Sequence, residues 1–229
     1  MKLDARLMLF VFLAGLFITA LLVGDIIGGK LYQLELGSTK LTISVGMIPF
    51  PIVFLLTDLI NEFYGKRAAQ YLTLVGFVMA LLTIAILTIA SQVPFAPFTQ
   101  AADWTGFDQA SFDRIFTGSR WMLFSSTVAY LVAQLIDIGV FHFVKRKLGD
   151  RMLWLRATGS TVVSQLVDTF VILLVAFGGQ LSFETLISLM ITSYSVKVVI
   201  AIALTPLIYA GHALVERGLG LEPNRVAQV

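Results

Sequence analysis

The sequence contains no cysteine, and only 13% of its 229 residues are charged. The absence of cysteine excludes disulfide and thiolate chemistry. Its two histidines, His142 and His212, belong to different segments, so we expect no metal, no haem and no other cofactor. The net charge is only +2 and the basic residues are scattered, so nucleic acid is not an expected partner.

Signatures of enzymes are also missing. The chain has no G-x-x-x-x-G-K-[ST] loop, so we do not expect it to hydrolyse a nucleotide itself. Ser160 lacks the sequence context of an activated nucleophile, and His142 lies at the end of a different segment. The sequence therefore predicts a protein that is not an enzyme.

Apolar residues dominate what remains. Hydrophobic residues make up 58% of the chain, 18 of its residues are Phe, and the mean hydropathy is +0.89. This composition is typical of an integral membrane protein, because soluble domains are about one quarter charged. Long apolar runs, together with a shorter one that opens with Pro49 and Pro51, predict six transmembrane helices. They span about residues 7–28, 48–63, 68–91, 121–144, 159–179 and 188–211.

The fold class that follows is an all-α membrane protein, a six-transmembrane-helix bundle in which residues 1–229 form a single integral membrane domain. Basic residues give its orientation. The predicted loops on one side of the membrane have only four basic residues, Lys30, Lys40, Arg114 and Arg120. The loops and termini on the opposite side carry many more: Lys2, Arg6, Lys66, Arg67, Lys145, Arg146, Lys147, Arg151, Arg156, Arg217 and Arg225. By the positive-inside rule, we expect both termini in the cytoplasm.

Two segments on the predicted outer side have patterns of their own. Residues 30–47 alternate as two short strands would around a Gly37-Ser38 turn, which predicts a short outer hairpin. Residues 92–120 contain DQASFDRIF, which predicts a short outer amphipathic helix. Whether these segments form a lid or ordinary connections is left open.

Polar residues recur inside the apolar segments. In LLTDLINEFYGK, residues 55–66, helical spacing places Asp58, Asn61 and Glu62 on one face. Such a face is not expected to meet lipid. A Gln-Leu-aliphatic-Asp repeat, 31 residues apart, places Gln134 with Asp137 and Gln165 with Asp168 on consecutive antiparallel helices. The two pairs would then point toward each other.

The depth of the ionisable groups predicts a polar interior. At 1.5 Å per residue, Asp58, Asp168 and Lys197 lie roughly 14 Å from the ends of their segments, near the membrane midplane. Asp25 would lie nearer the outer face. An ionised side chain at the centre costs about 2.5 to 3.5 kcal/mol or more, so we expect these groups to share a cavity. Lys197 could neutralise one acid, such as Asp168, but not all of them.

The remaining acids predict a ligand that offers N–H donors. A carboxylate accepts two N–H groups at once, and the amides of Asn61, Gln134 and Gln165 both donate and accept. From the residues alone, the ligand is either a small amine-bearing heterocycle or a cation.

Four blocks of the chain resemble a known family. They are FPIVFLLTDLINEFYGKR (50–67), QLIDIGVFHFVKRK (134–147), WLRATGSTVVSQLVDT (154–169) and YSVKVV (194–199). Over roughly residues 20–212, they resemble the queuosine precursor transporter family, also called a vitamin uptake transporter family. The resemblance implies a six-helix protein of the bacterial cell inner membrane, similar in fold to the substrate-binding subunits of energy-coupling-factor vitamin transporters. It implies import of 7-cyano- or 7-aminomethyl-7-deazaguanine for queuosine modification of tRNA.

The resemblance carries over to Asp58, Gln134, Asp137, Asp168 and Lys197, with Asn61 and Glu62 in a looser part of the motif. We expect the acids to accept hydrogen bonds from the base while Gln134 and Gln165 complete its polar edge, and an aromatic residue to stack on its face. The predicted substrate-binding residues are Asp58, Asn61, Glu62, Gln134, Asp137, Gln165, Asp168, Lys197, Phe54 and Tyr194.

Several alternatives stay open at this point. Transport could be facilitated, coupled to protons through a carboxylate such as Asp137, or powered by a separate energising module that hydrolyses ATP. A proton- or cation-conducting transporter, or a substrate-binding subunit of an energy-coupling-factor transporter, is the alternative function. The sequence does not decide between the cyano and aminomethyl precursors, nor whether the chain is a homo-oligomer.

Overall fold

The computed structural model describes residues 4–28, 30–36, 39–101, 103–117, 120–149, 152–177, 179, 181–218, 220 and 222–223. Within them, six helical segments are long and apolar enough to cross a membrane. The helices are α1 (Ala5–Ile27), α2 (Phe50–Phe63), α3 (Gly65–Ala90), α5 (Arg120–Leu148), α6 (Leu153–Phe177) and α7 (Phe183–Ala203), which continues into α8 (Thr205–Ala213). The protein is therefore a multi-pass membrane protein, and the predicted helical fold class is confirmed.

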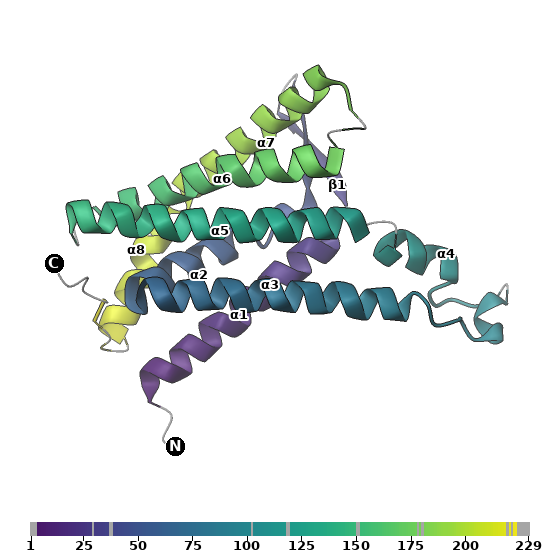
Figure 1. The fold of residues 1–229 in the computed structure, drawn as a ribbon, viewed down its shortest axis with the longest axis horizontal. Helices are drawn as coiled ribbons and strands as arrows, with labels where there is room; N and C mark the ends of the chain where they lie inside the picture. Colours follow the sequence, from purple (N-terminus) through teal and green to yellow (C-terminus); the bar gives the residue numbers. More distant parts are fainter. Residues whose placement is uncertain are drawn as a thin grey trace.

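Successive membrane segments run in opposite directions, so the start of α1 and the end of α8 lie on the same side of the bundle (Figure 1). We call this side the basic end, because Lys145, Arg146 and Lys147 occupy the last turn of α5 there. The predicted basic residues Lys2, Arg151 and Arg225 lie outside the described residues. We call the opposite side the hairpin end.

The elements at the hairpin end follow their sequence patterns. Strands β1 (Leu31–Leu36) and β2 (Thr39–Ser44) pair antiparallel, with Leu31 opposite Ser44. The predicted Gly37-Ser38 turn between them lies outside the described residues. Helix α4 (Gln109–Phe112) begins where the Asp108 carboxylate accepts a hydrogen bond from the Ser111 backbone N–H at 2.7 Å, and a single wider turn, Asp113–Thr117, extends it.

The last membrane segment differs from the single helix predicted at 188–211. Helix α7 ends at Ala203, and α8 begins at Thr205 after a break at Leu204. Pro206 in the first turn of α8 has no N–H to donate to the preceding turn, so the regular helix is interrupted there. The break lies between Lys197 in α7 and His212 in α8, and His212 is the residue that approaches Glu62 of α2.

Helix α2 is the most central element of the bundle. It packs against α1, α3, α5 and α8, and 10 of its 14 residues are buried. A short 3₁₀ turn (Val45–Met47) and Pro49 lead into it, and Pro51 fits its first turn, where a missing N–H costs nothing. Because α2 is surrounded by protein, its polar face meets other helices and not lipid.

Close packing joins α3 to its neighbours at Gly76. A Cβ atom added at Gly76 would lie 2.7 Å from Tyr130 Oη, 3.2 Å from Leu21 Cδ2 and 3.3 Å from Phe17 Cε1. Tyr130 Oη also donates a hydrogen bond to the Thr73 carbonyl at 3.2 Å. Glycine is therefore needed here for the close approach of α3 to α1 and α5.

We predict that Gly76→Val destabilises the bundle, by about 1 to 3 kcal/mol, because the new side chain overpacks this contact and displaces Tyr130. The thermal midpoint of the purified protein in detergent measures the effect. The matched control is Gly15→Val in α1, where an added Cβ meets nothing within 4 Å. An equal loss in both variants would contradict the packing argument.

Candidate functional site

The main cavity of the described structure has a volume of about 290 Å³. It lies in the half of the bundle toward the hairpin end, because its wall includes Gly28 at the end of α1 and Ser44 at the end of β2. Polar side chains from α1, α5, α6 and α7 converge on it, and Phe50 and Phe54 contribute an aromatic wall from α2. The polar residues in its wall include Asp25, Ser126, Gln134, Ser164, Gln165, Asp168, Thr169, Thr192, Ser193 and Lys197.

An ion pair joins α6 to α7 in the cavity wall. Lys197 Nζ lies 2.5 Å from Asp168 Oδ2, so the pairing predicted from the sequence is present. Both side chains keep some exposed surface, 13% for Lys197 and 19% for Asp168. Lys197 Nζ also lies 5.7 Å from the centre of the Phe50 ring, which places α2 beside the pair.

The Gln-Leu-aliphatic-Asp repeat brings two amides to the same cavity. Gln134 on α5 and Gln165 on α6 are both buried and both belong to the wall. Among the described residues, neither side-chain oxygen has a hydrogen-bond partner, and the hydroxyl of Thr169 has none either. Buried polar groups are normally paired, so these atoms are available to a ligand that presents hydrogen-bond donors.

Asp25 belongs to the cavity although it was not among the predicted site residues. It lies near the end of α1, and the Ser126 hydroxyl on α5 donates a hydrogen bond to its Oδ1 at 2.7 Å. The available signal was an acid inside the first apolar run. Its sequence neighbourhood carries no polar repeat or motif that pointed to the site.

Asp58 and Asp137 lie outside the cavity wall. Asp137 is fully buried and accepts a hydrogen bond at 3.1 Å from Ser164, which itself belongs to the wall. Asp58 is 2% exposed, and neither of its carboxylate oxygens has a hydrogen-bond partner among the described residues. The acids Asp137 and Glu62 are among its neighbours. These acids form a layer between the cavity and the basic end.

The two predicted aromatic residues also differ in position. Phe54 belongs to the cavity wall, and its ring centre lies 4.5 Å from that of Phe50. Tyr194 lies outside the wall, where its hydroxyl donates to the Val162 carbonyl at 3.2 Å.

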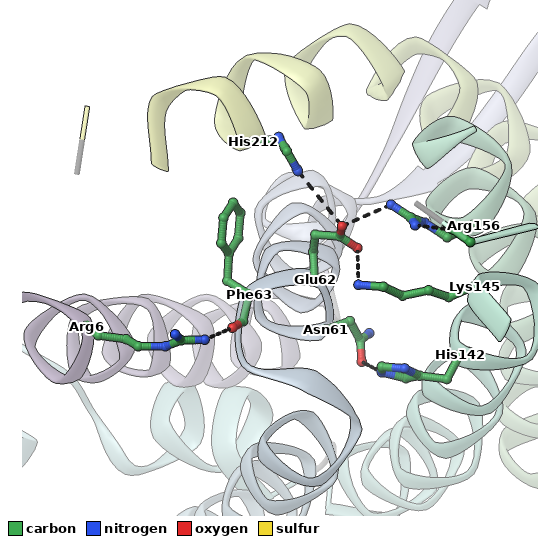
Figure 2. Close-up of polar contacts among 9 residues, drawn as sticks. Arg6, Asn61, Glu62, Phe63, His142, Lys145, Arg156 and His212 are labelled. Atoms are coloured by element: carbon green, nitrogen blue, oxygen red, sulfur yellow. Dashed lines mark hydrogen bonds and ion pairs between the residues drawn. The ribbon is translucent and has the colours of Figure 1, made fainter. Parts of the chain in front are cut away.

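Asn61 and Glu62 belong to a second polar cluster, at the basic end (Figure 2). Glu62 lies 3.0 Å from Lys145 on α5, 3.0 Å from Arg156 on α6 and 3.9 Å from His212 on α8. Asn61 Oδ1 lies 3.2 Å from His142 Nε2. Neither residue lines the cavity. The predicted polar face of α2 therefore exists, but at this end the Glu62 carboxylate and the Asn61 oxygen are matched by protein side chains.

The Glu62 cluster joins four helices through one carboxylate. Glu62, Lys145 and Arg156 are each 2% exposed or less, so water contributes little to their solvation. Arg156 also donates to the Gly149 carbonyl at 2.8 Å, at the turn between α5 and α6. Breaking the pairs would leave two cations buried without their counter-charge.

Comparison with known proteins decides the family. A family model described as "Putative vitamin uptake transporter" matches residues 44–211. The chain belongs to this family. One relative is the "Probable queuosine precursor transporter" of Bacillus subtilis strain 168. It is 30% identical over 178 residues, which are 76% of this chain and 74% of that protein.

Two further relatives match a shorter stretch. The "Queuosine precursor transporter" of Escherichia coli K12 is 26% identical over 58% of this chain and 54% of that protein. The "Probable queuosine precursor transporter" of Haemophilus influenzae is 29% identical over 58% of this chain and 51% of that protein. No solved structure matches the chain significantly. All three relatives are named as transporters, which supports the prediction that this protein is not an enzyme.

We predict that Glu62→Gln lowers the free energy of unfolding by about 3 to 5 kcal/mol, because Lys145 and Arg156 would stay buried without a counter-charge. Thermal or denaturant unfolding of the purified protein measures this loss. The control is Glu184→Gln, which changes an exposed acid in the first turn of α7. Wild-type stability in Glu62→Gln would show that the cluster does not hold the basic end together.

Proposed function

We propose that the protein is an importer of a queuosine precursor, 7-cyano- or 7-aminomethyl-7-deazaguanine, in the bacterial inner membrane. The names of the relatives support this substrate class. The observation that carries the proposal is the cavity in which two unpartnered amide oxygens, an ion-paired carboxylate and an aromatic wall come together. These groups match a flat base whose edge bears N–H donors.

In the proposed complex, the Asp168 carboxylate accepts hydrogen bonds from the ring N–H and the exocyclic amine of the base. Lys197 pairs with that carboxylate at 2.5 Å and would hold it in position for the base. Gln134 and Gln165 accept further N–H groups through their oxygens and donate to the ring carbonyl through their nitrogens. Phe54 stacks on the face of the base, and its place in the cavity wall favours it over Tyr194.

We further propose that the other predicted residues act along the path toward the basic end. Asp58 and Asp137 would meet the substrate after it leaves the cavity, which fits their position behind Ser164. Asn61 and Glu62 would meet it last, after the Glu62 cluster opens. The buried pairs of Glu62 with Lys145 and Arg156 support the view that this end is closed while the cavity is accessible from the hairpin end.

The proposed orientation places the basic end, and therefore both termini, in the cytoplasm, because positively charged loops are retained on that side. Helices α5 and α6 meet at this end, where Lys145, Arg146 and Lys147 lie in the last turn of α5. The hairpin end would then face outward, and the cavity would receive its substrate from outside.

Transport of a cation is the second candidate function. It is favoured by the presence of two carboxylates, Asp25 and Asp168, in one cavity. Such a transporter would show proton or cation flux in the absence of any purine analogue. The importer would show no such flux.

The deciding experiment uses a bacterial host that can neither make nor import the precursor. The host is grown with each precursor outside, with and without the full chain, and queuosine in its tRNA is measured. Queuosine should appear only when both the chain and a precursor are present. No queuosine with either precursor, in cells whose membranes contain the protein, would refute the proposed function.

Two variants test the proposed contacts. Gln165→Leu should reduce the uptake rate up to about tenfold, which corresponds to the free energy of roughly one hydrogen bond. Asp168→Asn should reduce the rate further, because it also leaves Lys197 without its counter-charge. Uptake of labelled precursor at a subsaturating concentration is the measurement. Gln92→Leu, at an exposed position outside the cavity, is the control and should transport at the wild-type rate. Unchanged uptake in both cavity variants would remove these residues from the site.

A further inference from the structure

The charges in the cavity wall do not balance. The described wall contains two acids, Asp25 and Asp168, and one base, Lys197. The lysine lies 2.5 Å from Asp168 and is therefore committed to it. Among the residues that the structure describes, no lysine or arginine forms an ion pair with Asp25. The wall consequently carries one carboxylate in excess.

Helix ends do not supply the missing positive charge. The C-terminal end of α1, near Asp25, and the N-terminal end of α2, at Pro49 and Phe50, both border the cavity. Helix ends carry about half a unit charge each, negative at the C-terminus and positive at the N-terminus. Their contributions oppose each other, so the side chains decide the electrostatic preference of the cavity.

Asp25 is also held in place for a ligand. The Ser126 hydroxyl donates to Oδ1 at 2.7 Å, which ties the carboxylate of α1 to α5. A carboxylate accepts up to about four hydrogen bonds, so one serine does not exhaust its capacity. Asp25 and Asp168 both line the cavity, so a cation between them would reduce the repulsion of two carboxylates.

A second, independent observation supports a ligand site in this cavity. Gln134, Gln165 and Thr169 are each buried by more than nine-tenths and line it, and each has a polar atom without a partner among the described residues. In the proposed complex, these atoms bind the polar edge of the base. The cyano and aminomethyl precursors share that edge, so these atoms do not distinguish between them.

We propose that Asp25 makes the cavity selective for the amine-bearing precursor over the cyano-bearing one, by pairing with its ammonium group. This inference rests on the function proposed above. A primary alkylamine resembles the lysine amine, whose pKa is about 10.4, so the aminomethyl form is a cation at neutral pH. The cyano group is uncharged and only accepts hydrogen bonds, so Asp25 offers it no favourable contact.

The test compares initial uptake rates of the two labelled precursors, at equal subsaturating concentrations, in cells that lack other uptake of either. The quantity of interest is the ratio of the aminomethyl rate to the cyano rate within one strain, because this ratio does not depend on how much protein the membrane contains. The full chain is compared with Asp25→Asn, Ser126→Ala and Asp103→Asn.

The wild-type ratio should be about ten or more, the value of one charge-assisted hydrogen bond. Asp25→Asn should bring it toward one while uptake of the cyano form persists, since the asparagine oxygen still accepts from Ser126. Ser126→Ala keeps the carboxylate and should keep a ratio well above one. Asp103→Asn changes an exposed acid outside the cavity and should match the wild type.

The possible failures are distinct. Equal wild-type uptake of both precursors, or a ratio that survives Asp25→Asn, would overturn the role of Asp25 and leave the importer intact. Uptake of neither precursor by the wild-type chain would refute the proposed function, and this inference with it.

Discussion

The cost of burying charge in an apolar bundle governs this structure. At the basic end, Glu62 is matched by Lys145 and Arg156, and the three side chains draw α2, α5 and α6 together. In the cavity, Lys197 matches Asp168. Among the described residues, Asp25 has no lysine or arginine partner, and the amide oxygens of the Gln repeat have no hydrogen-bond partner. The charged groups of the Glu62 cluster are therefore paired with one another, whereas the cavity presents polar groups that a ligand can satisfy.

Helix α2 connects these two regions. Its aromatic start, at Phe50 and Phe54, forms part of the cavity wall, and its last turn carries Glu62. Asp58 lies between them without a hydrogen-bond partner among the described residues. A small shift of α2 would change the cavity and the ion pairs together. The break between α7 and α8 at Leu204 lies between the cavity residue Lys197 and His212, which faces Glu62. Movement there offers a physical route between a closed and an open basic end.

Much of the fold was predictable because each spanning helix is a long apolar run. The Asp168 and Lys197 pair and the convergence of Gln134 with Gln165 followed from helical spacing and antiparallel neighbours. The partners of Glu62 could not be predicted from the sequence, because Lys145 and Arg156 lie in segments that were predicted to be loops. That their side chains point into the bundle depends on how the helices pack. Asp25 was not selected because its partner, Ser126, is 101 residues away in the sequence. The helix break at Leu204 lies within one continuous apolar run, where hydropathy gives no signal.

The central claim is that a precursor occupies the cavity between α5, α6 and α7. Because the chain has no cysteine, a single one can report on this directly. Ser193→Cys places a thiol in the cavity wall, and Ala101→Cys places one on an exposed loop. The rate of alkylation by a small maleimide is measured with and without saturating precursor. Protection at position 193 alone is the predicted result, and alkylation of both positions at rates that the precursor leaves unchanged would contradict the account.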